Sequence, residues 1–300
     1  MTFYTRPATL FEAVDLLAAA GAGGAAMAGG TDLLNQRRLG LRSPHTVIDL
    51  CDLQELRGVV PHGASDQNVV TIGGLTTVRD IRTNPSLATT TAALQDAASL
   101  LGGRQIQAMA TVGGNVCNAS PAAELATPLL VHRAVVEVIG PEGRRTLPLA
   151  EMWLGPGRVS LSPGEILVAF RISSGIALWP SAYRRLELRR SVDIAVVSAS
   201  AALNVDEQGV IVDATVAVGA VGPVATTVDS AASALIGVRL VPGEPSPAAL
   251  LAAATAGRAA ASVSQPIDDV RASGRYRRAM CGVVTKRAVV AAMGRWTPPK

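Results

Sequence analysis

Apolar residues near the start of the chain first recur at helical spacing and then form two short runs. The helical spacing covers residues 9–20, where Thr9 can act as the N-cap and the Gly/Ala stretch that follows ends the helix. The apolar runs at 25–28 and 46–50 predict two strands with a helix between them. Because strand, helix and strand follow one another, we expect a small α/β unit with a parallel strand pair.

The middle of the chain alternates between apolar runs, helical spacing and polar turns. This pattern predicts, in chain order, strand 69–72, helices 77–82 and 89–101, and strands 131–139 and 166–172. A Gly-Pro-Glu-Gly sequence directly follows the second of these strands and predicts a turn. We therefore expect a mixed or antiparallel sheet accompanied by helices.

The pattern breaks at residues 173–181, which we interpret as a linker. Beyond it, β-rich runs at 193–205 and 210–218 flank a hairpin signal, and helical spacing follows at 228–235, 247–261 and 276–293. This second part predicts a small antiparallel sheet with helices. The fold class is therefore α+β, with domains at 1–175 (subdomains of about 1–55 and 56–175) and 180–295.

Composition and charge narrow the functional classes. The chain has 300 residues, of which 49% are hydrophobic and 17% charged, against about a quarter charged in an average protein. This balance excludes a disordered chain, and an aromatic content of 3% offers few surfaces for stacking single-stranded nucleic acid. The net charge, 27 − 23 = +4, is small and spread along the chain, so we expect no nucleic-acid partner.

Metal-ligating and nucleophilic side chains are scarce and scattered. Cys51, Cys117 and Cys281 form no C-x-x-C motif, so the sequence predicts no disulfide framework and no local metal site. With three histidines in the chain, general bases are few, and a bound cofactor is the better candidate for any chemistry. We also expect a cytoplasmic protein, since the N-terminus lacks a signal-peptide pattern and no apolar run reaches the roughly 18 residues of a membrane span.

Two glycine motifs have the composition of a phosphate-binding surface. Residues 28–33 read Ala-Gly-Gly-Thr-Asp-Leu between a predicted strand and helix, and residues 110–115 read Ala-Thr-Val-Gly-Gly-Asn. Glycine lets the backbone approach a ligand, and backbone N–H groups bind phosphate oxygens. The first motif alone is equally compatible with an ordinary strand-to-helix turn. Two such motifs in one chain favour a bipartite clamp for a diphosphate.

These motifs resemble the two FAD loops of the FAD-binding (medium) subunit of the molybdenum hydroxylases, the xanthine dehydrogenase and carbon monoxide dehydrogenase type. The resemblance covers nearly the whole chain in the expected order, and includes segments 71–77, 120–124, 164–167, 189–195 and 276–280. It implies an FAD-binding domain of two subdomains over residues 1–175, followed by a C-terminal flavoprotein domain over residues 180–295.

The resemblance implies cofactor contacts for individual residues. The FAD diphosphate would bind mainly to backbone N–H groups of Ala26, Met27, Ala28, Gly29, Gly30, Thr31, Asp32 and Leu33, and of Thr111, Val112, Gly113, Gly114 and Asn115. Glu124, where the family usually has Asp, would bind hydroxyl groups, and Leu167 would pack by the isoalloxazine ring. Arg185 stands where relatives often carry Lys near the flavin, and Leu101 and Ser120 complete the contacts. Without a His in the first motif, FAD would be held non-covalently.

The resemblance also implies partners and a reaction class. The chain would be the FAD-carrying electron-transfer subunit of a molybdenum hydroxylase, an FAD-dependent oxidoreductase in which no side chain of this subunit need act as an acid or base. A small subunit would carry two [2Fe–2S] clusters and a large one the molybdopterin centre, in a heterotrimer or a dimer of heterotrimers. Two alternatives stay open: a stand-alone flavin oxidoreductase of the same fold, and a non-enzymatic assembly subunit without FAD.

Overall fold

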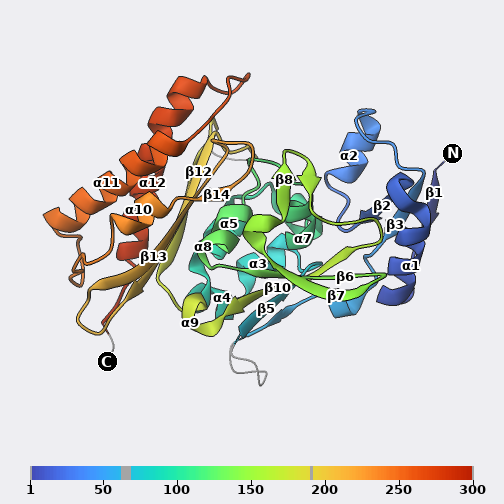
Figure 1. The fold of residues 1–300 in the computed structure, drawn as a ribbon, viewed down its shortest axis with the longest axis horizontal. Coiled ribbons are helices and arrows are strands. Elements are labelled where there is room, and N and C mark those ends of the chain that lie inside the picture. Colours follow the sequence, from blue (N-terminus) through green and yellow to red (C-terminus); the bar gives the residue numbers. More distant parts are fainter. Residues whose placement is uncertain (1, 62–68, 190–191, 299–300) are drawn as a thin grey trace.

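The computed structural model describes residues 2–61, 69–189 and 192–298, and Figure 1 shows how its elements are arranged. The N-terminal unit consists of β1 (Phe3–Thr5), α1 (Leu10–Ala20), β2 (Gly24–Met27), α2 (Leu33–Arg38) and β3 (Thr46–Asp49). Its strands lie parallel in the order β1-β3-β2. The Thr9 side chain caps α1 by accepting a hydrogen bond from the Glu12 N–H, as the sequence predicts.

A second unit combines an antiparallel sheet with a group of short helices. Its sheet contains β4 (Val59–Val60), β5 (Val69–Gly73), β6 (Val135–Gly140), β7 (Gly143–Pro148) and β10 (Ile166–Ser173). The strand order is β4-β5-β10-β6-β7. The helices are α3 (Val78–Thr83), α4 (Pro85–Thr90), α5 (Ala92–Leu100), α6 (Arg104–Met109), α7 (Val112–Cys117) and α8 (Ala126–Val131). A separate strand pair is formed by β8 (Trp153–Gly155) and β9 (Arg158–Val159).

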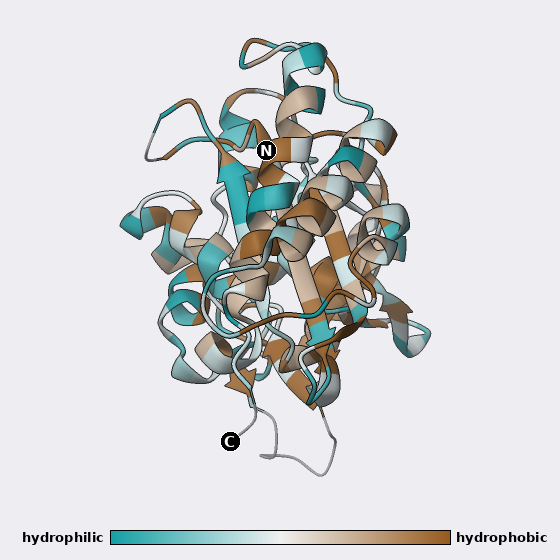
Figure 2. Cartoon of the chain, turned by 90° about the vertical axis from the view of Figure 1, so that its left-hand side faces the viewer, coloured by the Kyte–Doolittle hydropathy of each residue, from teal (hydrophilic) through white to brown (hydrophobic). Residues whose placement is uncertain are grey.

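The C-terminal unit is an antiparallel sheet covered by helices. After α9 (Ser174–Ala177), the strands are β11 (Ser181–Leu186), β12 (Val197–Val205), β13 (Ile211–Gly219) and β14 (Thr226–Thr227), paired in that order. The helices are α10 (Asp229–Ser233), α11 (Pro247–Val263) and α12 (Gly274–Met293). Helices α11 and α12 lie side by side over the sheet (Figure 1), and the strands behind them are largely apolar (Figure 2).

Polar side chains join the C-terminal unit to the helices of the second unit. The hydroxyl groups of Thr127 on α8 and Ser200 on β12 lie 3.0 Å apart in a buried position. Arg295, just after α12, donates to both carboxylate oxygens of Asp96 on α5, at 2.7 and 2.9 Å. These contacts hold the sheet of the C-terminal unit against α5 and α8.

The α+β class is confirmed, but two predicted elements are wrong in detail. The predicted strand 131–139 begins only at Val135, because Val131 ends α8 and Arg133 takes a left-handed conformation with φ of 50°. All six residues of α8 are buried, so their apolar pattern has no helical period to recognise. The predicted helix 89–101 is two helices, α4 and α5, because the backbone leaves the helical region at Thr91.

Two further segments differ from the sequence interpretation. The predicted linker 173–181 contains α9, and its last residue begins β11. The second glycine motif is largely helical rather than an open loop, since α7 begins directly after Thr111. Residues 190 and 191 of the resembling segment 189–195 lie outside the described residues. In the described part of the chain no helix has the length and apolar character that a membrane crossing requires.

Candidate functional site

Three Gly-Gly turns from separate parts of the chain meet between the first and second units. A Cβ atom on Gly29 would lie 1.8 Å from the carbonyl oxygen of Met109, just before the second motif. A Cβ atom on Gly113 would lie 2.6 Å from the carbonyl oxygen of Gly74. Gly74 also touches β10, where a Cβ atom would lie 2.7 Å from the carbonyl oxygen of Leu167. Glycine is therefore required here because backbone packs directly against backbone.

The turn at Gly29-Gly30, the first turn, presents unpaired backbone donors. Gly30 has a φ of 69°, a left-handed conformation that turns the chain from β2 into α2. Within the described residues, the N–H groups of residues 29–33 donate to no protein acceptor, and the Asp32 side chain does not cap α2. Ala28, Gly29, Gly30 and Thr31 are all partly accessible to solvent. A row of free N–H groups on accessible backbone is a binding surface for an anion.

The turn at Gly113-Gly114, the second turn, uses the N–H groups of residues 112–115 within the protein. The N–H groups of residues 112–115 donate to the carbonyl oxygens of Thr76, Gly74 and Thr111 and to the Thr111 hydroxyl, at 2.8 to 3.1 Å. Gly114 and Asn115 are nevertheless partly accessible. A Cβ atom on Gly114 would lie 3.8 Å from the Cβ atom of Ala28, so this glycine faces the first turn. The second turn thus offers close backbone approach and side-chain groups rather than N–H donors.

Side-chain hydrogen bonds fix the two turns relative to each other. The side-chain amide of Gln36 on α2 donates to the side-chain oxygen of Asn118 at 2.9 Å. Asn118 directly follows α7. Below the first turn, the Cys51 thiol donates to the carbonyl oxygen of Ala28 at 3.2 Å. Burial raises the pKa of Cys51 to about 11, so the sulfur stays a thiol at neutral pH. Gln36, Cys51 and Asn118 therefore belong to the site, and none of them is among the cofactor contacts predicted from the sequence.

Asn115 and Glu124 are connected through one turn. The Asn115 side-chain oxygen accepts a hydrogen bond at 3.2 Å from the N–H of Leu125, the residue that follows Glu124. Glu124 is buried, and its Oε1 atom lies 2.6 Å from Nη1 of Arg185 on β11. Desolvation raises the pKa of Glu124 to about 7, and Arg185 opposes this rise. A carboxylate at the edge of the glycine turns can accept hydroxyl hydrogen bonds from a ligand.

The structure brings most of the sequence-predicted contacts together around these turns. Leu167 packs against the Gly74 turn, and Ser120 follows α7 with its Oγ atom accepting from the Ala122 N–H. Leu101 is buried at the end of α5, where its carbonyl oxygen accepts a hydrogen bond from the side chain of Gln107. Arg185 belongs to the C-terminal unit and reaches the site through Glu124. A polar pair that spans 61 positions leaves no local signal in a sequence.

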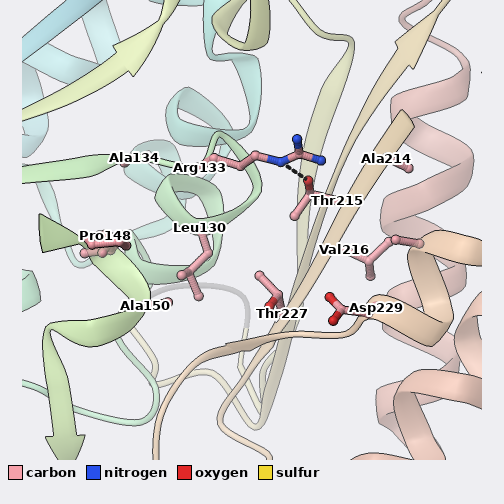
Figure 3. A pocket seen from close by; sticks show the side chains of 12 residues that line it. Leu130, Arg133, Ala134, Pro148, Ala150, Ala214, Thr215, Val216, Thr227 and Asp229 are labelled. Carbon is pink, nitrogen blue, oxygen red and sulfur yellow. Dashed lines mark hydrogen bonds between the residues drawn. The ribbon is translucent and has the colours of Figure 1, made fainter. Parts of the chain in front are cut away.

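Two cavities lie at the junction with the C-terminal unit rather than at the glycine turns. One, of about 380 Å³, opens between Leu130 and Arg133 on one side and Thr215, Val216 and Asp229 on the other (Figure 3). The other, of about 860 Å³, is bordered by both tryptophans of the junction, Trp179 and Trp296. Among the described residues, no group of three or more His, Cys, Asp or Glu side chains could hold a metal ion.

Two known family models match this chain, one in its N-terminal part and one in its C-terminal part. The model for the FAD binding domain in molybdopterin dehydrogenase matches residues 1–174. The model for the CO dehydrogenase flavoprotein C-terminal domain matches residues 181–292. Together these matches cover almost the whole chain.

Curated relatives and solved structures agree with these matches. The putative xanthine dehydrogenase FAD-binding subunit XdhB of Escherichia coli K12 is 35% identical over 204 residues, which is 68% of each chain. The carbon monoxide dehydrogenase medium chain of Afipia carboxidovorans is 29% identical over 292 residues, 97% of this chain and 96% of the relative. In the crystal structure of a Cu,Mo-CO dehydrogenase, a chain of 28% identity superposes with a TM-score of 0.89 over 98% of both chains.

Proposed function

Because this chain belongs to the family of FAD-binding subunits of molybdopterin dehydrogenases, we propose that its first and second Gly-Gly turns hold the diphosphate of FAD between them. As a member of this family, the chain is an FAD-dependent oxidoreductase subunit. FAD, when bound, supplies the redox chemistry by taking up electrons and passing them to an external acceptor. The chain's own residues bind and orient it.

The donor set around the turns fits an FAD diphosphate. The free N–H groups of residues 29–33 supply hydrogen bonds and partial positive charge to phosphate oxygens. Gly114 lies directly beside Ala28 and carries no side chain, so bare backbone of the second turn borders these donors. This pairing of free donors with bare backbone is the observation that carries the proposal. The first turn contains neither His nor Cys, so the contact is non-covalent.

Other residues around the turns are proposed to contact the parts of FAD beyond the diphosphate. Residues 26–33 and 111–115 contribute backbone and small side chains, and Ser120 and Leu101 border them. The carboxylate of Glu124 accepts hydroxyl hydrogen bonds, and Leu167 gives apolar contact to the ring. Arg185 acts on the cofactor through Glu124, since its side chain is only 2% exposed. No side chain in this set needs to transfer a proton.

We also propose that the chain works in a larger assembly in the cytoplasm. Two of the relatives are called medium chains of carbon monoxide dehydrogenase, which implies larger and smaller chains in those enzymes. By analogy, a small subunit carries two [2Fe–2S] clusters and delivers electrons to FAD on this chain. A large subunit carries the molybdopterin centre at which substrate reacts. The assembly is a heterotrimer or a dimer of heterotrimers.

A visible spectrum of the purified chain tests the cofactor assignment. We expect flavin absorption at one equivalent per chain, with release of free FAD on denaturation. A chain that stays colourless after incubation with FAD would contradict the proposal.

Co-expression tests the assembly. We expect dehydrogenase activity only when the large and small subunits are produced together with this chain. Substrate turnover by the isolated flavoprotein would favour a stand-alone flavin oxidoreductase instead.

A further inference from the structure

Glu124 and Arg185 come from different domains and meet in a buried ion pair. Glu124 lies in the turn after α7, and Arg185 lies on β11. Their closest atoms, Oε1 and Nη1, are 2.6 Å apart, and the two side chains are 12% and 2% exposed. Buried charges are stable only when they are paired, so each of these groups depends on the other. The pair therefore connects the edge of the glycine turns to the C-terminal domain.

Arg185 is held from its other side by Glu187. Nη2 of Arg185 donates to Oε2 of Glu187, which directly follows the end of β11. A guanidinium group is planar, so hydrogen bonds at both of its Nη atoms fix its orientation. Within the described residues, Nε of Arg185 is buried and has no partner. Glu187 thus fixes the side of the guanidinium that is not in contact with Glu124.

The cluster contains two carboxylates and a single guanidinium. Burial, with a smaller contribution from the charge of Glu187, raises the pKa of Glu124 to about 7 against the opposing effect of Arg185. Tyr183, on the same strand, is also buried, and burial and the Glu124 charge raise its pKa well above the usual value. Among the described residues these are the charged and titratable groups that face Glu124, while the α7 side contributes the neutral Asn115.

We propose that Arg185, anchored by Glu187, is a positioning residue that reaches across from the C-terminal domain and holds the Glu124 carboxylate ready for the hydroxyl groups of FAD. The proposal rests on the function proposed above. A carboxylate has about four acceptor positions, so the bond from Arg185 leaves capacity for hydroxyl donors. Retention of the cofactor then depends on docking of the C-terminal domain as well as on the glycine turns.

Proton binding by Glu124 gives FAD binding a pH dependence of defined sign. Hydroxyl donors favour the ionised carboxylate, so bound FAD lowers the pKa of Glu124 and its binding releases a proton. FAD affinity is therefore expected to rise as the pH increases through about 7. Loss of the Arg185 charge raises the pKa of Glu124 and moves this midpoint to higher pH. Loss of the Glu187 charge moves it to lower pH.

The test is an FAD titration of the full chain between about pH 6 and pH 8, followed by flavin fluorescence. The variants are Arg185→Met, Glu187→Gln and Glu124→Gln. The matched control is Arg184→Met, because Arg184 is the neighbour of Arg185 on β11 and pairs with Asp96, at 3.4 Å, instead of Glu124. Thermal unfolding of each apoprotein separates loss of the fold from loss of the site.

We expect Arg185→Met to weaken FAD binding about tenfold to hundredfold at neutral pH and to raise the pH midpoint. Glu187→Gln should lower the midpoint, Glu124→Gln should remove the pH dependence, and Arg184→Met should leave both affinity and midpoint unchanged. Wild-type affinity and midpoint in Arg185→Met, or an equal loss in Arg184→Met, would overturn the proposal.

A second variant covers the case in which Arg185→Met does not fold. Glu187→Gln keeps the shape of the cluster and its cation, so an unshifted midpoint in this variant overturns the proposal by itself. If the wild-type chain binds no FAD, the proposed function fails. If the wild type binds one equivalent and the variants match it, only the role of Arg185 fails.

Discussion

The two glycine turns at the centre of the site have the same Gly-Gly sequence but use it in different ways. In the described part of the chain, residues 29–33 leave their N–H groups free, whereas residues 112–115 use all of theirs within the protein. Gly29 and Gly113 each pack against backbone, whereas Gly30 adopts a left-handed conformation and Gly114 faces Ala28 of the first turn. A glycine motif therefore does not reveal by itself whether it supplies hydrogen bonds or only space.

The largest expected effect comes from filling a backbone contact. In Gly29→Ala the new Cβ atom would lie 1.8 Å from the Met109 carbonyl oxygen, so the first turn must move away from α6. We expect a loss of about 3 kcal/mol in unfolding free energy, measured by denaturant titration of the apoprotein. Gly175→Ala is the control, since nothing lies within 4 Å of its Cβ position. A stability equal to that of wild type would contradict the packing role of Gly29.

Gly114→Ala tests whether the missing side chain at this position serves ligand binding or protein packing. Its Cβ atom meets the Thr111 hydroxyl oxygen at 3.0 Å and otherwise projects towards Ala28. We expect about tenfold weaker FAD binding by fluorescence titration, with an apoprotein stability change of about 1 kcal/mol or less. If stability falls as far as in Gly29→Ala while FAD binding is retained, the two turns do not differ in the way described.

Asn118→Ala breaks the bond that connects the two turns. Removal of the Asn118 side chain takes away the acceptor of the Gln36 amide. Because Gln36 is only partly buried, we expect a loss of about 1 kcal/mol in unfolding free energy and a smaller decrease in FAD affinity than in Gly114→Ala. Asn35→Ala, on the same helix and hydrogen-bonded at its surface to Arg38, serves as the control. Equal FAD affinities in Asn118→Ala and wild type would show that the turns keep their spacing without this bond.

The smallest expected effect concerns the thiol below the first turn. Cys51→Ala removes one weak hydrogen bond to Ala28, so we expect a stability change of about 0.5 kcal/mol. Since burial raises the pKa of Cys51 to about 11, alkylation of this thiol should be slow at neutral pH and accelerate at alkaline pH. Rapid alkylation at pH 7, measured by mass spectrometry, would show that the first turn is more open than the structure indicates.

The sequence was sufficient where local signals were strong. Thr9 caps α1, and the strand-helix-strand order gives the parallel unit that leads into the first turn. The sequence was insufficient where tertiary packing determines the secondary structure. Helix α8 is apolar on every side, and Thr91 divides a helical pattern that looks continuous.

At the site, the identity of the two turns could be predicted, but not their hydrogen bonds. Whether an N–H group is free depends on partners such as Thr76 and Gly74, which lie far away along the chain. The contact between Glu124 and Arg185 likewise arises only when β11 packs against α5 and α8. Glu187 stands two residues from Arg185, but nothing in the sequence links it to a cofactor.

The meeting of three glycine turns also bears on the order of events during folding. Gly29, Gly74 and Gly113 come from distant positions, so the space between them closes only after long-range pairing in two sheets is complete. Long-range contacts form slowly because loop closure is entropically costly. A chain that refolds in the presence of FAD should therefore regain its helical signal before it quenches flavin fluorescence. The time course of flavin uptake therefore reports when the glycine turns come together, the final step of folding.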